Sequence, residues 1–293
     1  MKNIVCFGEV LWDVFPTHKK IGGAPLNVAS RLKSLENNVT IITKIGNDAE
    51  GKEIKDFITD RGIATDNIQI DADLKTGEVA VLLDTNGAAS YTINFPRAWD
   101  NLEVTENAKE IVKKSDAFIF GSLVARNQLS RNTLYELLKL AKYKIFDINL
   151  RAPHYTSEIL KHLMTASDFI KFNDDEIYEI AKSFGFNSIS LEENIQFIVK
   201  ETNTKSICVT KGGEGAVLYY NDKFYYNAGY KIEVADTVGA GDSFLASLTD
   251  KLLKGTLPQD AIDFASAVGA IVASKAGANP IISDTEIRTK INS

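Results

Sequence analysis

Cysteine is scarce in this 293-residue chain, which has only Cys6 and Cys208, each within an apolar run. Two cysteines exclude a disulfide scaffold, and we expect both to be buried thiols rather than a disulfide. The three histidines, His18, His154 and His162, are scattered and show no metal-ligand spacing. With 6 prolines and 19 glycines, the chain also lacks the composition of collagen-like or low-complexity proteins.

Positive charge does not dominate either. The chain has 33 Lys and Arg against 39 Asp and Glu, a net charge of -6, and no basic run longer than a pair. We therefore expect no nucleic-acid partner. No stretch approaches the length of a membrane span, and the first residues, MKNIVCFGEV, show no signal-peptide cleavage pattern. These absences predict a cytoplasmic protein with no membrane partner.

Apolar runs without polar alternation, such as Lys2–Phe7, Val39–Ile45 and residues 116–121, are separated by stretches of helical periodicity. This pattern predicts an α/β fold in which a parallel sheet is covered by helices on both faces. No Pro-, Gly- or Ser-rich linker divides the chain. We therefore predict a single domain over residues 1–293.

Two stretches break this rhythm because they contain no helix. Residues Glu9–Phe15 and Asn67–Asn94, the latter with an Asn-Gly turn, are typical of short antiparallel strands joined by hairpins. Such a small sheet cannot bury both of its faces. We expect a lid, formed by about 9–20 and 67–96, that packs over the main sheet and also joins a second subunit, giving a homodimer.

The most informative segment is DTVGAGDSF, which begins at Asp236. Gly239, Ala240 and Gly241 precede a predicted helix, and backbone amides at a helix start form an anion site. Asp242 places a carboxylate beside that site, as transfer of a phosphoryl group to an alcohol requires of a base. A helix cap after a glycine turn explains the segment alone nearly as well. The third glycine of a dinucleotide fingerprint is missing, which disfavours an oxidoreductase.

A glycine pair, Gly22-Gly23, precedes Pro25 and starts a predicted helix, whose first turn contains Asn27. The Asn27 amide can donate to and accept from a polyol, although an incidental Asn at a helix start explains this segment by itself. Asp13 interrupts an apolar strand-like run. Its carboxylate is suited either to sugar hydroxyls or to an ion pair within the lid.

Asn173 and Glu176 follow another strand-like run, at the spacing of a helix capping box. The same two side chains are also suited to a Mg-nucleotide complex, through water molecules on the metal. The segment TKGGEG, from Thr210 to Gly215, is either a plain hairpin loop or a nucleotide-binding edge.

In this order, the four motifs GGAPLNVA, NDDE, TKGGEG and DTVGAGDSF resemble those of the ribokinase (PfkB) family of carbohydrate kinases, over essentially the whole chain. The resemblance implies a ribokinase-like three-layer αβα sandwich, with a mostly parallel central sheet and a small β-sheet lid. It also implies ATP and Mg2+ as cofactors, often with K+, and small-molecule sugar and ATP as partners.

The resemblance assigns roles to individual residues. It implies that Asp242 is the catalytic base and that the anion hole is formed by Gly239, Ala240 and Gly241. It implies that the sugar is contacted by Asp13, Gly23, Asn27, Arg97 and Asp100, and the nucleotide by Asn173, Thr210, Gly212, Gly215 and Asn279. Glu176 would support Mg2+ through water, and Asp236 would bind a monovalent cation.

Within the family the chain is most similar to fructokinases, through GEVLWD, FPRAWDNL and DINLR, with Trp99 where a small residue is usual. A sugar-phosphate acceptor would require clustered Lys or Arg near Asn27 and in the lid, whereas Arg97 is the only obvious candidate near a lid strand. This favours a neutral hexose, with fructose converted to fructose 6-phosphate. The alternatives are 2-keto-3-deoxygluconate kinase, whose acidic substrate Arg97 could serve, another sugar kinase of the same family, and a non-catalytic sugar-binding regulatory relative. The intact Asp242 and Gly-Ala-Gly turn argue against the last of these.

Overall fold

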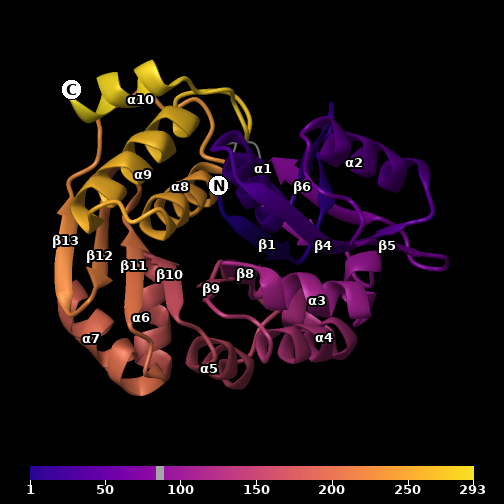
Figure 1. Cartoon of the computed structure of the whole chain (residues 1–293), viewed down its shortest axis with the longest axis horizontal. Coiled ribbons are helices and arrows are strands. Elements are labelled where there is room, and N and C mark those ends of the chain that lie inside the picture. Colours follow the sequence, from indigo (N-terminus) through magenta and orange to yellow (C-terminus); the bar gives the residue numbers. More distant parts are fainter. Residues whose placement is uncertain (84–88) are drawn as a thin grey trace.

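The computed structural model describes residues 1–83 and 89–293, and within them nine strands form one twisted sheet (Figure 1). Their order is β13-β12-β11-β10-β9-β8-β1-β4-β5. All neighbours pair in parallel except at one edge, where β12 is antiparallel to both β11 and β13. The strands are β1 (Asn3–Phe7), β4 (Asn38–Gly46), β5 (Ile68–Asp71), β8 (Ala117–Gly121), β9 (Lys144–Asp147), β10 (Phe169–Asn173), β11 (Ser206–Thr210), β12 (Ala216–Tyr220) and β13 (Lys223–Asn227).

Helices cover both faces of this sheet, which confirms the predicted α/β sandwich. One face packs against α1 (Ala24–Ser34), α2 (Ala49–Asp60), α8 (Ala240–Leu253) and α9 (Pro258–Ala273), and α10 (Asp284–Ile291) packs on α9. The other packs against α3 (Glu106–Lys114), α4 (Gln128–Leu138), α5 (Ser157–Thr165), α6 (Asp174–Ser183) and α7 (Leu191–Thr202). Alternate residues of β1 point into the two cores. Val5 and Phe7 pack in the core with α3–α7, and Ile4 and Cys6 pack in the core with α1, α2, α8 and α9.

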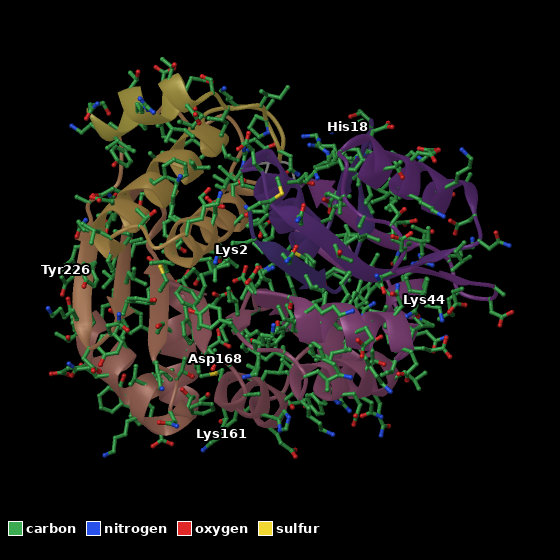
Figure 2. All side chains as sticks on the ribbon, viewed as in Figure 1. Lys2, His18, Lys44, Lys161, Asp168 and Tyr226 are labelled. Carbon is green, nitrogen blue, oxygen red and sulfur yellow. The ribbon has the colours of Figure 1, made fainter. Side chains whose placement is uncertain are left out.

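A second, four-stranded sheet forms the lid, in the order β3-β2-β6-β7. Its strands are β2 (Leu11–Val14), β3 (Lys19–Gly22), β6 (Gly77–Leu83) and β7 (Ala89–Ile93). In Figure 2, His18 stands at the outer end of this part of the molecule, where its ring stacks on that of Phe15 with 4.5 Å between the centroids.

The structure corrects two predictions about the lid. Residues Ile68–Asp71 form β5 of the main sheet, because the helix α2 between β4 and β5 lets the two strands pair in parallel; the lid therefore does not begin near residue 67. The lid is also not wholly antiparallel, since β2 pairs in parallel with β6. The predicted Asn86-Gly87 turn lies outside the described residues.

Both cysteines are buried and free, as predicted. In the described ranges, no helix is both long enough and apolar enough to cross a membrane.

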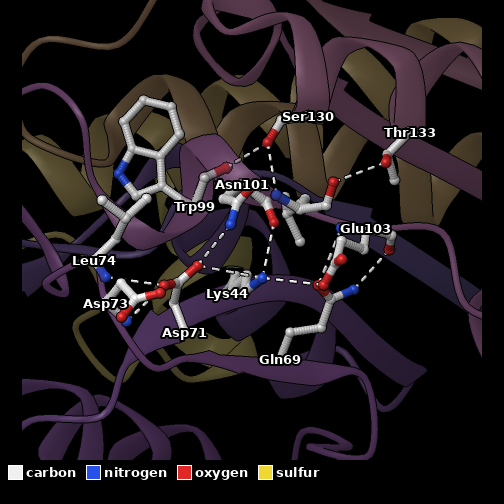
Figure 3. A network of polar contacts seen from close by, with 11 residues as sticks. Lys44, Gln69, Asp71, Asp73, Leu74, Trp99, Asn101, Glu103, Ser130 and Thr133 are labelled. Atoms are coloured by element: carbon white, nitrogen blue, oxygen red, sulfur yellow. Dashed lines mark hydrogen bonds and ion pairs between the residues drawn. The ribbon is translucent and has the colours of Figure 1, made fainter.

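A buried lysine fastens the segment that follows the lid to the main sheet (Figure 3). The Lys44 ammonium, at the end of β4, lies 3.3 Å from a carboxylate oxygen of Asp71 in β5. It also donates to the carbonyl of Asn101 (2.9 Å) and lies 3.2 Å from the Glu103 carboxylate. Asn101 in turn donates to Asp71 (2.9 Å). The short 3-10 helix η1 (Ala98–Asn101) is thereby held against the carboxyl ends of two strands.

We predict that Lys44→Met lowers the free energy of unfolding by about 3 kcal/mol or more, because it leaves the buried Asp71 carboxylate without its cation. Urea unfolding followed by circular dichroism measures this. The matched control is Lys52→Met, which removes the exposed ion pair with Asp56 and should change stability by less than about 1 kcal/mol. Equal losses in the two variants would contradict a structural role for the Lys44 network.

Candidate active site

The predicted base, Asp242, lies in the first turn of α8, immediately after Gly239, whose φ of +77° is accessible to glycine. Its carboxylate does not cap the helix. Instead, the side-chain amide of Asn27 in α1 donates to Asp242 Oδ2 at 2.8 Å. The Asn27 oxygen accepts from the side-chain amide of Asn279, also at 2.8 Å. Three segments that are distant in sequence therefore meet at this carboxylate.

The surroundings of Asp242 make it a weaker acid than an ordinary aspartic acid. Burial, followed by the nearby negative charge of Asp147, raises the pKa of Asp242 to about 6. The Asn27 hydrogen bond and the positive charges of Lys171 and Arg151 act in the opposite direction. A carboxylate with this pKa is ionised at neutral pH and basic enough to accept a proton.

Lys171 and Asp147 form a buried ion pair that the sequence analysis missed. Lys171 Nζ, on β10, lies 3.1 Å from Asp147 Oδ1 at the end of β9. Burial alone would lower the pKa of Lys171, but the carboxylates of Asp147, Glu176 and Asp242 raise it above its usual value. A Cβ placed on Gly241 would lie 3.4 Å from this ammonium, so the positive charge sits directly beneath the Gly239–Gly241 turn.

A cavity of about 630 Å³ opens beside this turn, a volume typical of small-molecule sites. Its lining includes most of the predicted nucleotide-binding and anion-hole residues, namely Asn173, Thr210, Gly212, Gly215, Ala240 and Gly241, together with Lys171. Asn279 is not among the lining residues and contacts Asn27 instead.

The glycine turn gives the anion site fewer free amides than expected. A Cβ at Gly239 would lie 2.6 Å from Ala278, so the turn packs tightly against the loop after α9. The Ala240 amide already donates to the carbonyl of Thr237 at 3.2 Å. The amides of Gly239 and Gly241 make no such bond among the described residues, but only Gly241 of these two lines the cavity.

The segment from Asn173 to Glu176 is a complete capping box at the start of α6. The Asn173 side chain accepts from the Glu176 amide at 2.8 Å, and Glu176 accepts from the Asn173 amide at 2.7 Å. The other Glu176 oxygen accepts from the amide of Leu150 at 2.8 Å. Glu176 thus fixes the loop after β9. In the described residues, no cluster of three or more His, Cys, Asp or Glu side chains is arranged to hold a metal ion.

The predicted sugar residues lie near two further charged groups. Burial raises the pKa of Asp13 to about 6, against the positive charges of Arg151 and Lys20. Glu9 is only 3% exposed, and burial raises its pKa to about 7. The charges of Arg151 and Asp242 both act on Glu9. Gly23 has a φ of +108°, and a Cβ there would lie 2.6 Å from the Glu9 carbonyl, so only glycine fits.

Of the two sugar residues predicted at the lid end, Asp100 is occupied by protein groups, whereas the Arg97 side chain has a buried Nε without a partner among the described residues. Asp100 is fully buried, and its two oxygens accept from the guanidinium of Arg126 at 2.7 Å each. One of them also accepts from the Arg97 amide at 2.8 Å. Asp100 is therefore enclosed by protein groups. Arg126, whose guanidinium carbon lies 3.9 Å from the centre of the Trp99 ring, is a cation that no local sequence pattern predicted.

Asp236 already has a cationic partner within the chain. Its Oδ2 lies 3.4 Å from Lys20 Nζ on the lid strand β3 and accepts from the Gly277 amide at 3.2 Å. Its Oδ1 accepts from the Val238 amide at 3.0 Å.

Comparisons with known proteins agree with this arrangement. The model of the family described as pfkB family carbohydrate kinase matches residues 1–285. The chain is 30% identical over 313 aligned positions to a probable chloroplastic fructokinase-6 of Arabidopsis thaliana, covering 97% of this chain and 80% of that protein.

Two solved structures share the fold with the same TM-score. One is a fructokinase with bound ATP from Xylella fastidiosa, with TM-score 0.87 and 21% identity over 100% of this chain and 99% of that one. The other is a 2-dehydro-3-deoxygluconokinase from Thermotoga maritima, with TM-score 0.87 and 19% identity over the whole of both chains. Because the family model matches nearly the entire length and a fructokinase relative is 30% identical, the chain belongs to the pfkB family of carbohydrate kinases and is a sugar phosphotransferase.

Proposed function

We propose that this chain is a fructokinase, which transfers the γ-phosphoryl group of ATP to D-fructose to give fructose 6-phosphate and ADP. The observation that carries the proposal is the 2.8 Å hydrogen bond between Asn27, a predicted sugar residue, and Asp242, which adjoins the predicted nucleotide cavity. A base at this junction can reach a sugar hydroxyl on one side and a phosphate on the other. The 30% identical fructokinase relative supports the choice of sugar.

The proposed step divides the work among the residues of the site. Asp242 takes the proton from the sugar hydroxyl as the hydroxyl oxygen forms a bond to the γ-phosphorus. At the same time, the bond between the γ-phosphorus and the leaving oxygen of ADP breaks. Asn27 holds the accepting carboxylate in one orientation. Lys171 and the amides of Gly239 and Gly241 stabilise negative charge on the transferring group. The lid strands exclude water, which would otherwise compete as acceptor.

The carboxylates around Lys171 are suited to a hydrated metal ion that arrives with the nucleotide. Asp147 Oδ2 is buried and has no protein partner among the described residues, and oxygen ligands are the ones that Mg2+ prefers. We propose that Asp147 and Glu176 would contact such an ion through its water molecules. The ion would neutralise phosphate charge when bound.

The charges of the site favour a neutral sugar. The Arg126 guanidinium is neutralised by Asp100, and Arg151 acts on the carboxylates of Glu9, Asp13 and Asp242. An acidic substrate would add a further carboxylate to this group. One observation favours the alternative, 2-keto-3-deoxygluconate: in the described part of the chain, Nη1 of Arg126 is buried without a partner, and a substrate carboxylate could supply one.

We predict that Asp242→Asn lowers kcat by about 10² to 10⁴ while ATP binding and melting temperature stay near their wild-type values, because an amide cannot accept the proton. Coupled ADP-release kinetics, calorimetry and thermal unfolding measure the three quantities. The matched control is Asp284→Asn in the first turn of α10, an exposed helix-start carboxylate that should leave kcat unchanged. A near wild-type kcat for Asp242→Asn would eliminate the assigned base.

The same base predicts how turnover depends on pH. Because the pKa of Asp242 is raised to about 6, the carboxylate is ionised above that pH and protonated below it. We expect kcat/KM, which reports the ionisation of the free enzyme, to fall as the pH drops through about 6. In Lys171→Met the fall should begin at a higher pH, since the positive charge that lowers the pKa of Asp242 is gone. An acid limb at the same pH in both enzymes would count against this assignment.

For the substrate, we predict a higher kcat/KM for fructose than for ribose or 2-keto-3-deoxygluconate in the ADP-release assay. Asp13→Ala should raise the KM for the sugar by about 5- to 150-fold, the equivalent of about 1–3 kcal/mol for an unpaired polar partner, with little change for ATP. Glu78→Ala is the matched control. Glu78 pairs with Trp12 on β2, the neighbour of Asp13, and therefore lies on the face of the lid sheet opposite to Asp13. A higher kcat/KM for the keto-deoxy acid would overturn the assignment as a fructokinase but not the assignment as a sugar kinase.

We further propose that residues 1–293 form one kinase domain, that the protein is cytoplasmic, and that two copies associate through their lids. On one face of the lid sheet, Leu11 and Val79 are buried in a small apolar cluster, whereas Phe15 and Ile93, which pack against it, are only partly buried. A second lid would cover this face. Light scattering at micromolar concentration should give the mass of a dimer, and Ile93→Asp, at a partly buried position of the cluster, should reduce it to that of a monomer. A wild-type monomer would refute the association.

A further inference from the structure

Two adjacent lysines of the lid strand β3 make contacts on opposite sides of the sheet. Lys19 Nζ lies 4.1 Å from the centre of the Trp12 ring and 3.4 Å from the Glu53 carboxylate of α2. Lys20 is paired with Asp13 in the strand register, and its Nζ lies 3.4 Å from Asp236 Oδ2. Lys20 therefore connects the lid to the loop that leads into the anion site, whereas Lys19 connects it to α2.

The Asp236 carboxylate joins three parts of the chain. It accepts from the amide of Val238 in its own loop at 3.0 Å, and from that of Gly277 in the loop after α9 at 3.2 Å. The ammonium of Lys20 adds the lid as the third part. In Figure 1 the yellow segment after α9 approaches the indigo N-terminal segments, as these contacts require. Asp236 thus fixes the loops on either side of the Gly239–Gly241 turn.

A monovalent cation, which the family resemblance implies at Asp236, does not fit this arrangement. Oδ1 of Asp236 accepts from a backbone amide, and Oδ2 accepts from another amide and already faces an ammonium. A further cation bound to Oδ2 would lie close to the Lys20 ammonium, which is itself 3.4 Å from this oxygen, and the two positive charges would repel each other. The chain itself supplies one positive charge at this carboxylate.

The contact is also weak enough to form and break during turnover. The side chain of Lys20 is 45% exposed and that of Asp236 is 21% exposed, and ion pairs this accessible to solvent contribute little to folding stability. Such a contact can break when the lid opens for sugar and form again when the lid closes for transfer.

We propose that Lys20 is a positioning residue of the sugar kinase reaction, whose ammonium takes the place of a bound monovalent cation at Asp236. When the lid closes, Lys20 neutralises Asp236 and holds the loop before the Gly239–Gly241 turn in the orientation that receives phosphate. The proposal rests on the kinase function given above. Its consequence is that turnover of the wild-type enzyme does not depend on added K+.

The test compares the full-length wild-type enzyme with Lys20→Met, Lys20→Arg and Lys19→Met, in potassium chloride and in tetramethylammonium chloride at equal ionic strength. We expect the wild-type kcat/KM to agree within about twofold between the salts. Lys20→Met should lose about tenfold in tetramethylammonium, more than its exposed ion pair alone predicts, and recover in potassium. Lys20→Arg, which keeps the charge, and Lys19→Met, the matched control, should resemble the wild type in both salts.

A second measurement does not need a sugar substrate. The melting temperature of the ADP-saturated protein should rise in potassium relative to tetramethylammonium for Lys20→Met and stay unchanged for the wild type and Lys19→Met. If no sugar were phosphorylated, the kinase assignment would fail and this measurement would still decide the role of Lys20. Potassium activation of the wild type by more than about fivefold, equivalent to roughly 1 kcal/mol, would overturn the proposal. So would a Lys20→Met enzyme indistinguishable from Lys19→Met in both salts.

Discussion

The hydrogen bond from Asn27 to Asp242 joins helices from the two ends of the chain, and the site depends on it. One turn further along α1, the buried guanidinium of Arg31 donates to Ser243 Oγ at 3.3 Å and to the Pro280 carbonyl at 3.0 Å. Because residues four apart lie on one face of a helix, a single face of α1 positions both the start of α8 and the loop after α9. The base, the glycine turn and that loop are therefore placed by the same helix.

The main sheet could be predicted from the sequence because its information is local. The run Val39–Ile45 is apolar without alternation, which indicates a strand covered on both faces, and the glycine pair before Pro25 indicates a helix start. The lid could not be predicted in the same way. Leu11–Val14 of the lid is only four residues long, and so is Ile68–Asp71, which the sequence analysis assigned to the lid but which belongs to the main sheet. The partners of such short strands are decided by the packing of α2 and by long-range pairing rather than by their own composition.

The residues of the candidate site also differ in how far local sequence predicts them. Gly23, Asn27 and Asp242 lie in motifs with glycine turns and helix starts, and the structure brings them together as the sequence suggested. Lys171 had a faint signal, a lysine within an otherwise apolar parallel strand, which requires a buried anion nearby. Arg126 had none, because its importance arises only where Asp100 meets it across 26 residues. Charge pairs between separate loops are properties of the fold.

Several buried polar atoms near the cleft have no protein partner in the described residues, including Glu9 Oε2, Asp147 Oδ2, Asn279 Oδ1 and Arg126 Nη1. A buried polar atom that is left without any partner costs about 1–3 kcal/mol. A substrate that supplies the missing partners recovers this free energy on binding, and one that lacks the matching hydroxyl leaves the atoms unpaired. The same buried groups that weaken the empty fold locally therefore make the site selective, and they explain why polar side chains persist where apolar ones would pack better.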